Sequence, residues 1–263
     1  GFANDLGSHG GALYATATCT VRRCVFLYNR CGDRGSAIWS GTGGNVLLEN
    51  CLIAGNTGNG TVLTEGGRIT LKHCTVVRNR SGTLPSVHCR SGGPIWVLNS
   101  IVWDNVSYLT PHNLNASDSQ VIWTNGCTYP VPSTGSGNTT NVPQFVRDGD
   151  GHGTTYSNGN FRLQPVSPCI DSALAAVALA SDLDGNARNS DGNGDGSAGY
   201  DKGAYEAEEY TVGALRAGLL QDRSGGIVPL TVALVVTNVA GTQTNGLSYA
   251  WDFGDGTTTN SGL

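Results

Sequence analysis

The chain has 263 residues, of which 39 are glycine, none is methionine and 13% are charged. Its net charge of −5 argues against partners that need a basic face, such as nucleic acid or an anionic membrane surface. No apolar run approaches the roughly 20 residues that cross a bilayer, so no membrane span is predicted.

Four segments of the chain align without gaps. They are CTVRRCVFLYN from Cys19, VLLENCLIAGN from Val46, ITLKHCTVVRN from Ile69 and IWVLNSIVWDN from Ile95. Their central small residues are 27, 23 and 26 residues apart, and we call them the anchor column: Cys24, Cys51, Cys74 and Ser100. Five residues after each anchor lies an asparagine, and these form the asparagine column: Asn29, Asn56, Asn79 and Asn105.

Self-similarity at this period predicts stacked units, none of which buries its apolar face alone. Apolar and polar residues alternate within each block, which is typical of strands with one face turned inward. A short strand is also expected before each block, as in GGALY from Gly10 to Tyr14. A leucine-rich repeat has an overlapping period, but the blocks lack its leucine signature. The sequence therefore predicts an all-β fold, a right-handed parallel β-helix with two or three strands per rung.

The alignment turns the anchor column inward as a ladder of small buried side chains. Disulfides between adjacent rungs are the alternative, because stacked Cβ atoms lie near bonding range. For the asparagine column we expect stacked amides that hydrogen-bond one another and the turning backbone. A carbohydrate-binding role is the alternative for that column.

The GGAL and GSAI elements and the FLYN-like endings resemble repeats of β-helical surface proteins, including polymorphic outer-membrane and autotransporter-type passengers. The resemblance covers about residues 10–110. It implies a fold but no particular chemistry.

From Val121 the pattern changes. VIWTNGCTYP reads as one more rung, and NVPQFV, NFRLQPVSPCID, DLDGNAR and GYDKGAYE follow. In that order the strings resemble the terminal segment of many secreted bacterial β-helix proteins, which ends in a DLDGNxR loop and a GAYE strand. The resemblance implies a cap that closes the coil over about 121–209, within a β-helix domain of residues 1–209. By the same resemblance, Cys127 and Cys169 are the expected disulfide.

The acidic loop after this point offers oxygen ligands at alternate positions, in Asp191, Asn193 and Asp195, with Asp201 further on. Calcium takes six to eight such oxygens, so these residues predict a calcium site. Asp182 and Asp184 belong to the same site or only pin Arg188. The alternative for the whole loop is a solvated Asp/Gly turn.

Residues 210–263 contain WDFGDG, Trp251 to Gly256, which resembles the signature of the polycystic-kidney-disease (PKD) type of immunoglobulin-like sandwich. Such a sandwich takes roughly 100 residues, so a partial PKD-like domain is expected here. Either the natural protein continues, or a neighbouring subunit donates the missing strands.

No catalytic residue is predicted, because the few carboxylates of the repeats share no column that would face a common cleft. Gly151-His152-Gly153 resembles a polygalacturonase motif, but the acidic companion motifs of that family are absent. Eight cysteines fit an oxidising setting, and the chain is expected to be secreted and already processed, or a piece of something longer.

The expected function is that of a non-catalytic structural or adhesive protein of a bacterial surface or matrix, with self-association into fibres as an extension. The alternative is a polysaccharide-binding or polysaccharide-degrading protein, a lyase or hydrolase. Exposed tryptophans would then stack on sugar rings, and the candidates are Trp39, Trp96, Trp103 and Trp123.

Overall fold

The computed structural model describes residues 9–107, 110–114 and 120–209, and four later strands within 216–262. The chain divides into two compact units, Gly1–Glu209 and Tyr210–Leu263. In the described part of the chain no helix is long and apolar enough to cross a membrane.

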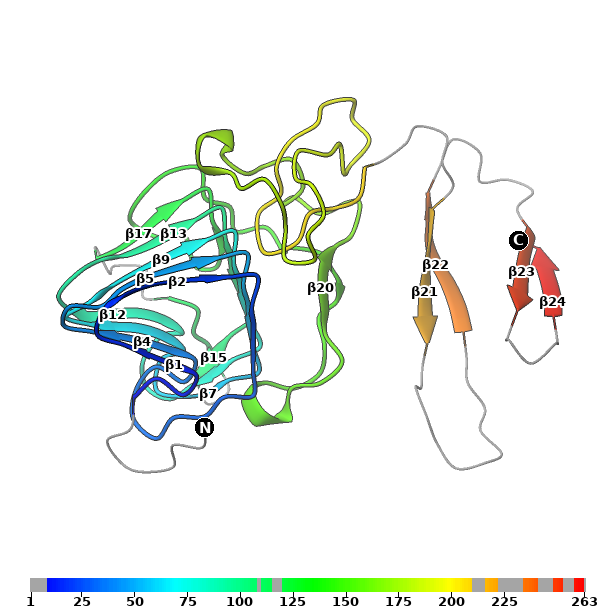
Figure 1. Ribbon diagram of the computed structural model, residues 1–263. Helices are drawn as coiled ribbons and strands as arrows, with labels where there is room; N and C mark the ends of the chain where they lie inside the picture. The colour runs from blue at the N-terminus through cyan, green and yellow to red at the C-terminus, as the bar shows by residue number, and fades with distance from the viewer. Residues whose placement is uncertain are drawn as a thin grey trace. The chain divides into compact units, whose positions relative to one another are not determined.

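The first unit contains a coil in which every turn contributes strands to parallel sheets (Figure 1). The first sheet holds β1 (Leu13–Ala15), β4 (Ile38–Gly41), β8 (Val62–Glu65) and β12 (Val87–Ser91). The second sheet holds β2 (Thr18–Arg22), β5 (Asn45–Glu49), β9 (Arg68–Lys72), β13 (Ile95–Leu98) and β17 (Val121–Thr124). The third sheet holds β3 (Val25–Leu27), β6 (Leu52–Ala54), β10 (Thr75–Val77), β14 (Ile101–Trp103) and β18 (Cys127–Thr128).

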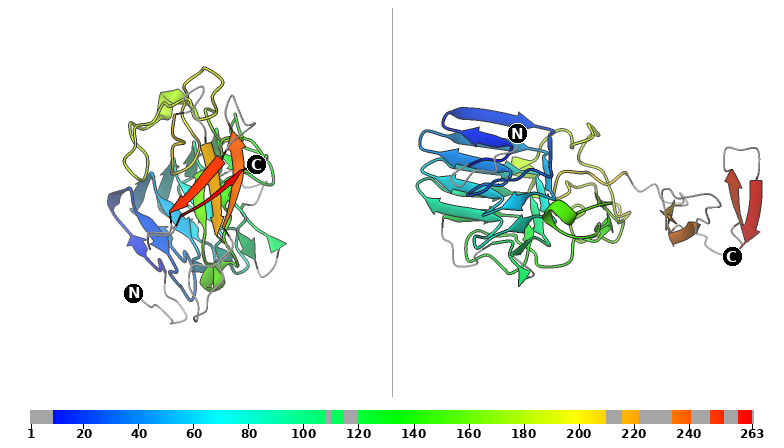
Figure 2. Two further views of the ribbon diagram at one scale, coloured as in Figure 1. Left: turned by 90° about the vertical axis from the view of Figure 1, so that its right-hand side faces the viewer. Right: turned by 90° about the horizontal axis from the view of Figure 1, so that it is seen from below.

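Residues that the sequence alignment superimposes pair with one another in these sheets. Val46 pairs with Ile69, and Ile69 pairs with Ile95. In the view from below in Figure 2 the rungs of the coil lie one upon another. The predicted right-handed parallel β-helix is confirmed.

A fourth, short sheet was not expected from the sequence. It holds β7 (Thr57–Gly58), β11 (Arg80–Ser81), β15 (Val106–Ser107) and β16 (Thr110–Pro111). Strands β7, β11 and β15 begin directly after the asparagine column, and β16 pairs antiparallel to β15. Two-residue strands carry too little alternation to be recognised as strands from sequence.

The chain turns from the second sheet to the third at a residue with positive φ, which lies just before the anchor in each rung. These residues form the corner column, with φ between 47° and 53°: Arg23, Asn50, His73, Asn99 and Asn125. Left-handed backbone is costly for most side chains and least so for Asn, Asp and His, so three asparagines and a histidine suit this corner.

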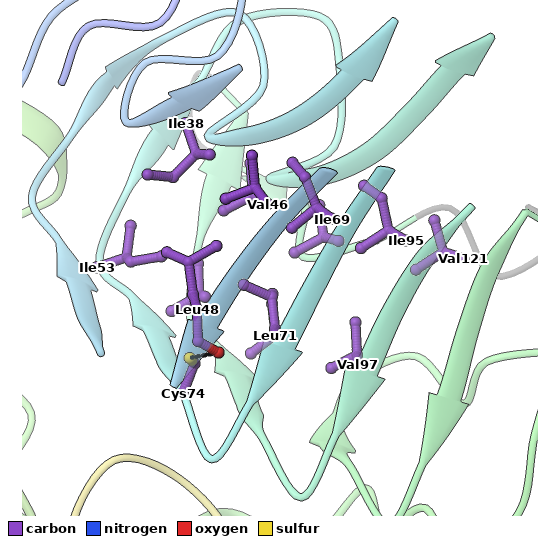
Figure 3. Close-up of a cluster of buried hydrophobic side chains, with 14 of the residues drawn as sticks. Ile38, Val46, Leu48, Ile53, Ile69, Leu71, Cys74, Ile95, Val97 and Val121 are labelled. Atoms are coloured by element: carbon purple, nitrogen blue, oxygen red, sulfur yellow. Dashed lines mark hydrogen bonds between the residues drawn. The ribbon is translucent and has the colours of Figure 1, made fainter. Parts of the chain in front are cut away.

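The inward side chains form a continuous core, drawn in Figure 3. Val46, Ile69 and Ile95 stack as one fully buried row, and Leu48 and Leu71 begin a second. Stacking identical columns of branched side chains removes apolar surface from water on every rung, which is the main source of stability in such a coil.

The anchor column is buried at Cys51, Cys74 and Ser100, but Cys24 is exposed. The prediction that all four lie inside is therefore wrong for Cys24. Cys24 precedes β3, which pairs only with β6 among the described strands, so no described rung covers it.

After the coil, residues 143–207 form what we call the lateral segment. It contains the hairpin of β19 (Phe145–Arg147) and β20 (Asn160–Leu163), with the 3-10 turns η1 (Gly153–Thr155) and η2 (Ala175–Val177). Phe145, Phe161 and Tyr205 of this segment pack on the outward side chains of the third sheet, which include Leu52, Ala54, Val77 and Ile101. Figure 1 shows β20 running beside the coil.

This arrangement corrects the predicted end cap, because most of the segment covers a side of the coil. Only residues 134–139 extend its end, where Thr124 bridges Ser136 and Cys127 bridges Thr139. The third sheet needs a cover because it is apolar on both faces. The expected GAYE strand is also absent, since residues 203–206 are not a strand, and Ala204 N–H donates to Thr75 Oγ1 over 2.9 Å.

The second unit is described only by its backbone strands. β21 (Arg216–Gln221) pairs antiparallel with β22 (Leu234–Ala240), and β23 (Ser248–Asp252) pairs antiparallel with β24 (Thr258–Gly262). WDFGDG begins in β23, and its residues after Asp252 lie outside the described residues.

Candidate functional site

A groove of about 370 Å³ opens on the coil at β7 and β11 of the fourth sheet. Its lining is small and polar: Gly32, Thr57, Gly58, Asn59, Arg80, Ser81, Gly82 and Thr83. The register places Arg80 beside Thr57, and Thr57 in turn bridges Arg30. Two arginines therefore flank one threonine in three successive rungs.

Hydrogen-bond donors predominate in this groove. Arg80 Nε is buried and has no acceptor among the described residues. Asn59 Oδ1 accepts the N–H groups of Thr83 and Leu84, both over 2.9 Å. Its Nδ2 is left to donate elsewhere. No carboxylate lies in the lining.

Beside the groove, a charged cluster joins the coil to the lateral segment. Asp104 lies 3.0 Å from Arg78 Nε and 3.1 Å from His152 Nε2. The hydrogen bond from His152, together with Arg78, lowers the pKa of Asp104 against the opposing effect of burial. Burial raises the pKa of Asp148, whose carbonyl accepts from Arg78 Nε over 2.8 Å.

The sequence analysis did not bring this cluster together, because His152 lies 48 residues beyond Asp104. One signal was present. Arg78 and Asp104 both lie four residues after their anchors, so the alignment already stacks these opposite charges on adjacent rungs.

The predicted calcium ligands lie in separate settings. Asp191 Oδ1 accepts from Gly194 N and Oδ2 from Gly196 N, while Asn193 and Asp195 cap the next residues of the same loop. Asp201 is buried, and burial and Glu206 raise its pKa to about 8. Within the described ranges no three His, Cys, Asp or Glu side chains are grouped to hold a metal ion.

Asp182 and Asp184 also have other roles in the structure. Asp182 Oδ1 accepts the N–H groups of Gly185 and Asn186, each over 2.8 Å, and so closes its own turn. Asp184 pairs with Arg162 instead of Arg188.

Arg188 pairs with Glu206 at 2.9 Å, and both side chains are almost fully buried. Its guanidinium also donates to Asn50 Oδ1 over 2.8 Å and to the Gly203 carbonyl over 2.9 Å. Glu206 accepts the N–H groups of Asn189 and Asp201. The DLDGNAR and GAYE strings thus form one buried ion pair that fastens the lateral segment to the coil.

Cys127 and Cys169, the predicted disulfide, are buried free thiols. Their hydrogen bond, together with burial, raises the pKa of Cys127. In the anchor column, a hydrogen bond between the thiols of Cys51 and Cys74 lowers the pKa of Cys51, while burial raises the pKa of Cys74. Ser100 Oγ accepts from Cys74 N–H over 2.9 Å.

The asparagine column lies where the alignment places it. Each side-chain amide donates to the Oδ1 of the next rung, over 2.9 Å from Asn29 to Asn56 and 2.8 Å from Asn56 to Asn79 and from Asn79 to Asn105. Asn113 extends the column by accepting from Asn105 Nδ2 at 3.0 Å. Because Asn56, Asn79 and Asn105 are fully buried, their amides cannot reach a carbohydrate, and that alternative is wrong.

The candidate sugar-stacking tryptophans are not open platforms. Trp39 and Trp123 are buried, and Trp96 and Trp103 are half-buried. The widely exposed aromatic side chains of the described residues are tyrosines: Tyr14, Tyr28 and Tyr129.

Comparison with known proteins agrees with the architecture. Residues 4–131 match the family model described as a right-handed β-helix region. Neither a curated protein nor a solved structure matches the chain. The family includes structural or adhesive proteins and polysaccharide-degrading proteins, so the match alone does not distinguish these functions.

Proposed function

We propose that this parallel β-helix protein is a non-catalytic structural or adhesive module of a bacterial cell surface or extracellular matrix. The observation that carries the proposal is how the polar groups of the coil are used. The asparagines of the column hydrogen-bond one another between rungs, and Arg188 pairs with Glu206 in the lateral segment. Both sets of interactions are buried. A fold that uses its buried polar residues for rigidity suits a load-bearing or display role.

The same proposal includes a secreted location and a PKD-like sandwich after residue 209. Eight cysteines and the WDFGDG string support these two points. The Asp191 loop would take calcium by exchanging its present N–H bonds for metal contacts, since its carboxylate and amide oxygens are close in sequence. Self-association of such modules into fibres is an extension of the proposal.

Electron microscopy of the native secreted material, first in calcium and then in chelator, tests this function. Ordered fibres or a continuous surface layer are expected, and their loss in chelator would place calcium in the assembly. Separate monomers in both conditions would contradict a structural polymer.

A polysaccharide lyase or hydrolase is the second candidate, and the Asp104 cluster favours it. Two carboxyl groups with opposite pKa shifts lie near a histidine and an arginine, an arrangement that also serves proton transfer. Incubation with uronate oligomers, followed by measurement of unsaturated and reducing ends, separates the two functions. Turnover that disappears in Asp104→Asn would overturn the non-catalytic function.

A further inference from the structure

We propose that Cys24 and Cys51 form a redox-modification site, in which a low-molecular-weight disulfide oxidises the two thiols to a reversible disulfide between adjacent rungs. Cys24 is the thiol that meets the oxidant, and Cys51 is the thiol that resolves the mixed disulfide. Cys74, one rung further on, is a positioning residue for Cys51. Neither the groove at β7 and β11 nor the Asp104 cluster takes part, so the site is compatible with a structural or a catalytic module.

Exposure distinguishes Cys24 from the other cysteines of the described residues. Cys24 is exposed, Cys19 is half-buried and the remaining six are buried. Cys24 lies before β3, which pairs only with β6 among the described strands, so a small disulfide reaches its sulfur without opening the coil. The exposed Arg23 precedes it and donates to a neutral carbonyl, that of Leu183. The charge of Arg23 therefore favours an anionic oxidant such as oxidised glutathione.

The ladder of backbone hydrogen bonds places Cys51 directly beside Cys24. Leu52 N–H, in the residue after Cys51, donates to the Cys24 carbonyl over 3.0 Å. Strands of a parallel sheet are about 4.8 Å apart, which lies within the Cα separation of about 4.4–6.8 Å that a disulfide spans. Each sulfur donates to the carbonyl two residues before it, over 3.2 Å in Cys24 and 3.4 Å in Cys51, so the two side chains have the same orientation.

The reaction is a thiol–disulfide exchange in two balanced steps. In the first, the Cys24 thiolate attacks one sulfur of oxidised glutathione, a mixed disulfide forms on Cys24 and one glutathione thiolate leaves. In the second, the Cys51 thiolate attacks the Cys24 sulfur, the disulfide between the rungs forms and the other glutathione thiolate leaves. The two cysteine protons end on the two glutathione thiolates, so two protein thiols are oxidised and one external disulfide is reduced.

Cys51 is suited to the second step although it is buried. A hydrogen bond with the Cys74 thiol, aided by the Cys24 N–H, lowers the pKa of Cys51 against the effect of burial. A lower pKa increases the share of thiolate, which is the nucleophilic form. Cys74 is itself fully buried beside Leu48 in the core (Figure 3). Desolvation, together with Cys51, raises the pKa of Cys24, so its attack on the oxidant is the slower step.

The place of Cys24 in the outermost described rung explains why Cys51 bonds Cys24 and not Cys74. Stacked Cβ atoms repeat at the strand spacing of about 4.8 Å, whereas a disulfide needs about 3.8 Å. Cys74 lies between two described rungs, and its approach would disturb the core. The rung of Cys24 has a described neighbour on one side only, so it moves more easily. The remaining misfit strains the bond and makes it reducible.

Incubation of the reduced, folded full chain with oxidised glutathione tests the site. Intact mass and peptide mapping after an acid quench are the readouts. We expect a disulfide between Cys24 and Cys51 with no retained glutathione, and its loss in excess reduced glutathione. Recovery of Cys24 as an unmodified thiol, or of a disulfide between Cys51 and Cys74, would overturn the site. Persistence of the Cys24–Cys51 bond in excess reduced glutathione would overturn its reversibility.

Cys51→Ser separates the two steps. It should stop the reaction at the mixed disulfide, so that glutathione stays on Cys24. Ser100 occupies the same column, so serine suits this position. The matched control is Cys19→Ser in the same rung as Cys24, which should form the Cys24–Cys51 disulfide as the parent chain does. Equal retention of glutathione by the parent chain and Cys51→Ser would show that Cys51 does not resolve the mixed disulfide.

The positioning role of Cys74 has its own test. Cys74→Ala removes the hydrogen bond to Cys51 and should slow the decay of the mixed disulfide about tenfold. Cys74→Ser keeps a hydrogen-bond donor and should restore most of the rate. Equal slowing in both variants would show that Cys74 acts through packing alone and would overturn its positioning role.

Discussion

Among single residues, the buried asparagines make the most hydrogen bonds to neighbouring rungs. Asn79 Oδ1 accepts both the N–H and the side-chain amide of Asn56, and its own amide donates to Asn105 and to the Ile53 carbonyl. In Asn79→Ala these buried groups lose their partners, and we expect the free energy of unfolding to fall by about 3 kcal/mol. Urea denaturation measures the change. Exposed Asn45→Ala should cost less than about 0.5 kcal/mol, and an equal loss in both variants would contradict this role of the column.

The buried histidine of the corner column makes stability depend on pH. Burial, assisted by Arg188, holds the pKa of His73 at about 2. Its Nδ1 lies 3.0 Å from the Asp201 carbonyl and Nε2 lies 3.0 Å from Asn99 Nδ2, so the neutral ring is hydrogen-bonded at both nitrogens. The unfolded chain binds a proton below about pH 6.5 and the folded chain does not, so this contribution to stability is lost as pH falls from about 6.5 towards 2.

His73→Asn removes this titration and retains a residue type that the same corner holds in Asn50 and Asn99. As the pH falls from 6 to 4.5, we expect the free energy of unfolding of the parent chain to decrease. The decrease should exceed that of the variant by about 1.4 kcal/mol per pH unit. Chemical denaturation at several pH values measures the difference. Parallel pH profiles would show that His73 becomes protonated in the folded chain.

How far single residues are predictable follows from their place in the repeat. The asparagine column follows from the alignment because its spacing from the anchor is constant. Asn113 escapes prediction since it follows Asn105 by only eight residues, after an antiparallel excursion through β16. The groove could not be predicted, because Arg80 and Thr57 are different residue types. Their place in one column is recognised only once the fourth sheet is known.

At the scale of elements, the lateral segment depends on its aromatic contacts. Phe161 is buried, packs edge-on against Phe145 at 5.2 Å and stacks with Tyr156 at 5.9 Å. Phe161→Ala should lower the free energy of unfolding by about 3–5 kcal/mol and should expose residues 143–207 to protease before the coil. Thermal unfolding and timed proteolysis measure both effects. Val166→Ala, at a side chain that is 75% exposed, should change neither.

The predicted disulfide would join two elements, the last rung of the coil and the lateral segment. Cys127 and Cys169 are fully buried, and their thiols interact. Closing a loop of about 40 residues should stabilise the fold by about 4 kcal/mol. Peptide mapping of the protein isolated without reductant should recover the linked pair, and Cys169→Ser should show the stability of the reduced chain. Recovery of both residues as alkylated thiols would contradict the prediction.

The place of the lateral segment had a signal in the sequence that the resemblance to an end cap obscured. Strands β6 and β10 are apolar at every position except Thr75. In a strand with one solvent-exposed face, apolar and polar residues alternate. Apolar outward residues such as Leu52 and Val77 therefore demand a cover along the side of the coil. The Arg188–Glu206 pair could not be assigned from sequence, because several carboxylates near Arg188 were equivalent partners by spacing alone.

At the scale of the whole first unit, the lateral segment joins rungs that would otherwise contact only their neighbours. Every corner-column side chain bonds a carbonyl of this segment, through the pairs Arg23–Leu183, Asn50–Ser181, His73–Asp201, Asn99–Leu174 and Asn125–Ser172. A simple solenoid is stabilised only by nearest-neighbour contacts and can open from one end. Hydrogen bonds from five successive rungs to the lateral segment should instead make the coil and this segment unfold as one cooperative unit.

Native-state hydrogen exchange tests this cooperativity, because it reports the free energy of opening strand by strand. In the parent chain, amides of β5 and β13 should exchange with similar free energies. Asn50→Gly keeps the positive φ of the corner and removes the bonds to Ser181 and Arg188, so β5 should open about 1–3 kcal/mol more easily while β13 is less affected. Asn158→Gly is the control, an exposed residue with φ of 58° that makes no such tie, and it should leave both strands unchanged. If β5 already opens more easily than β13 in the parent chain and Asn50→Gly adds nothing, the lateral segment is a passive cover and the coil opens rung by rung.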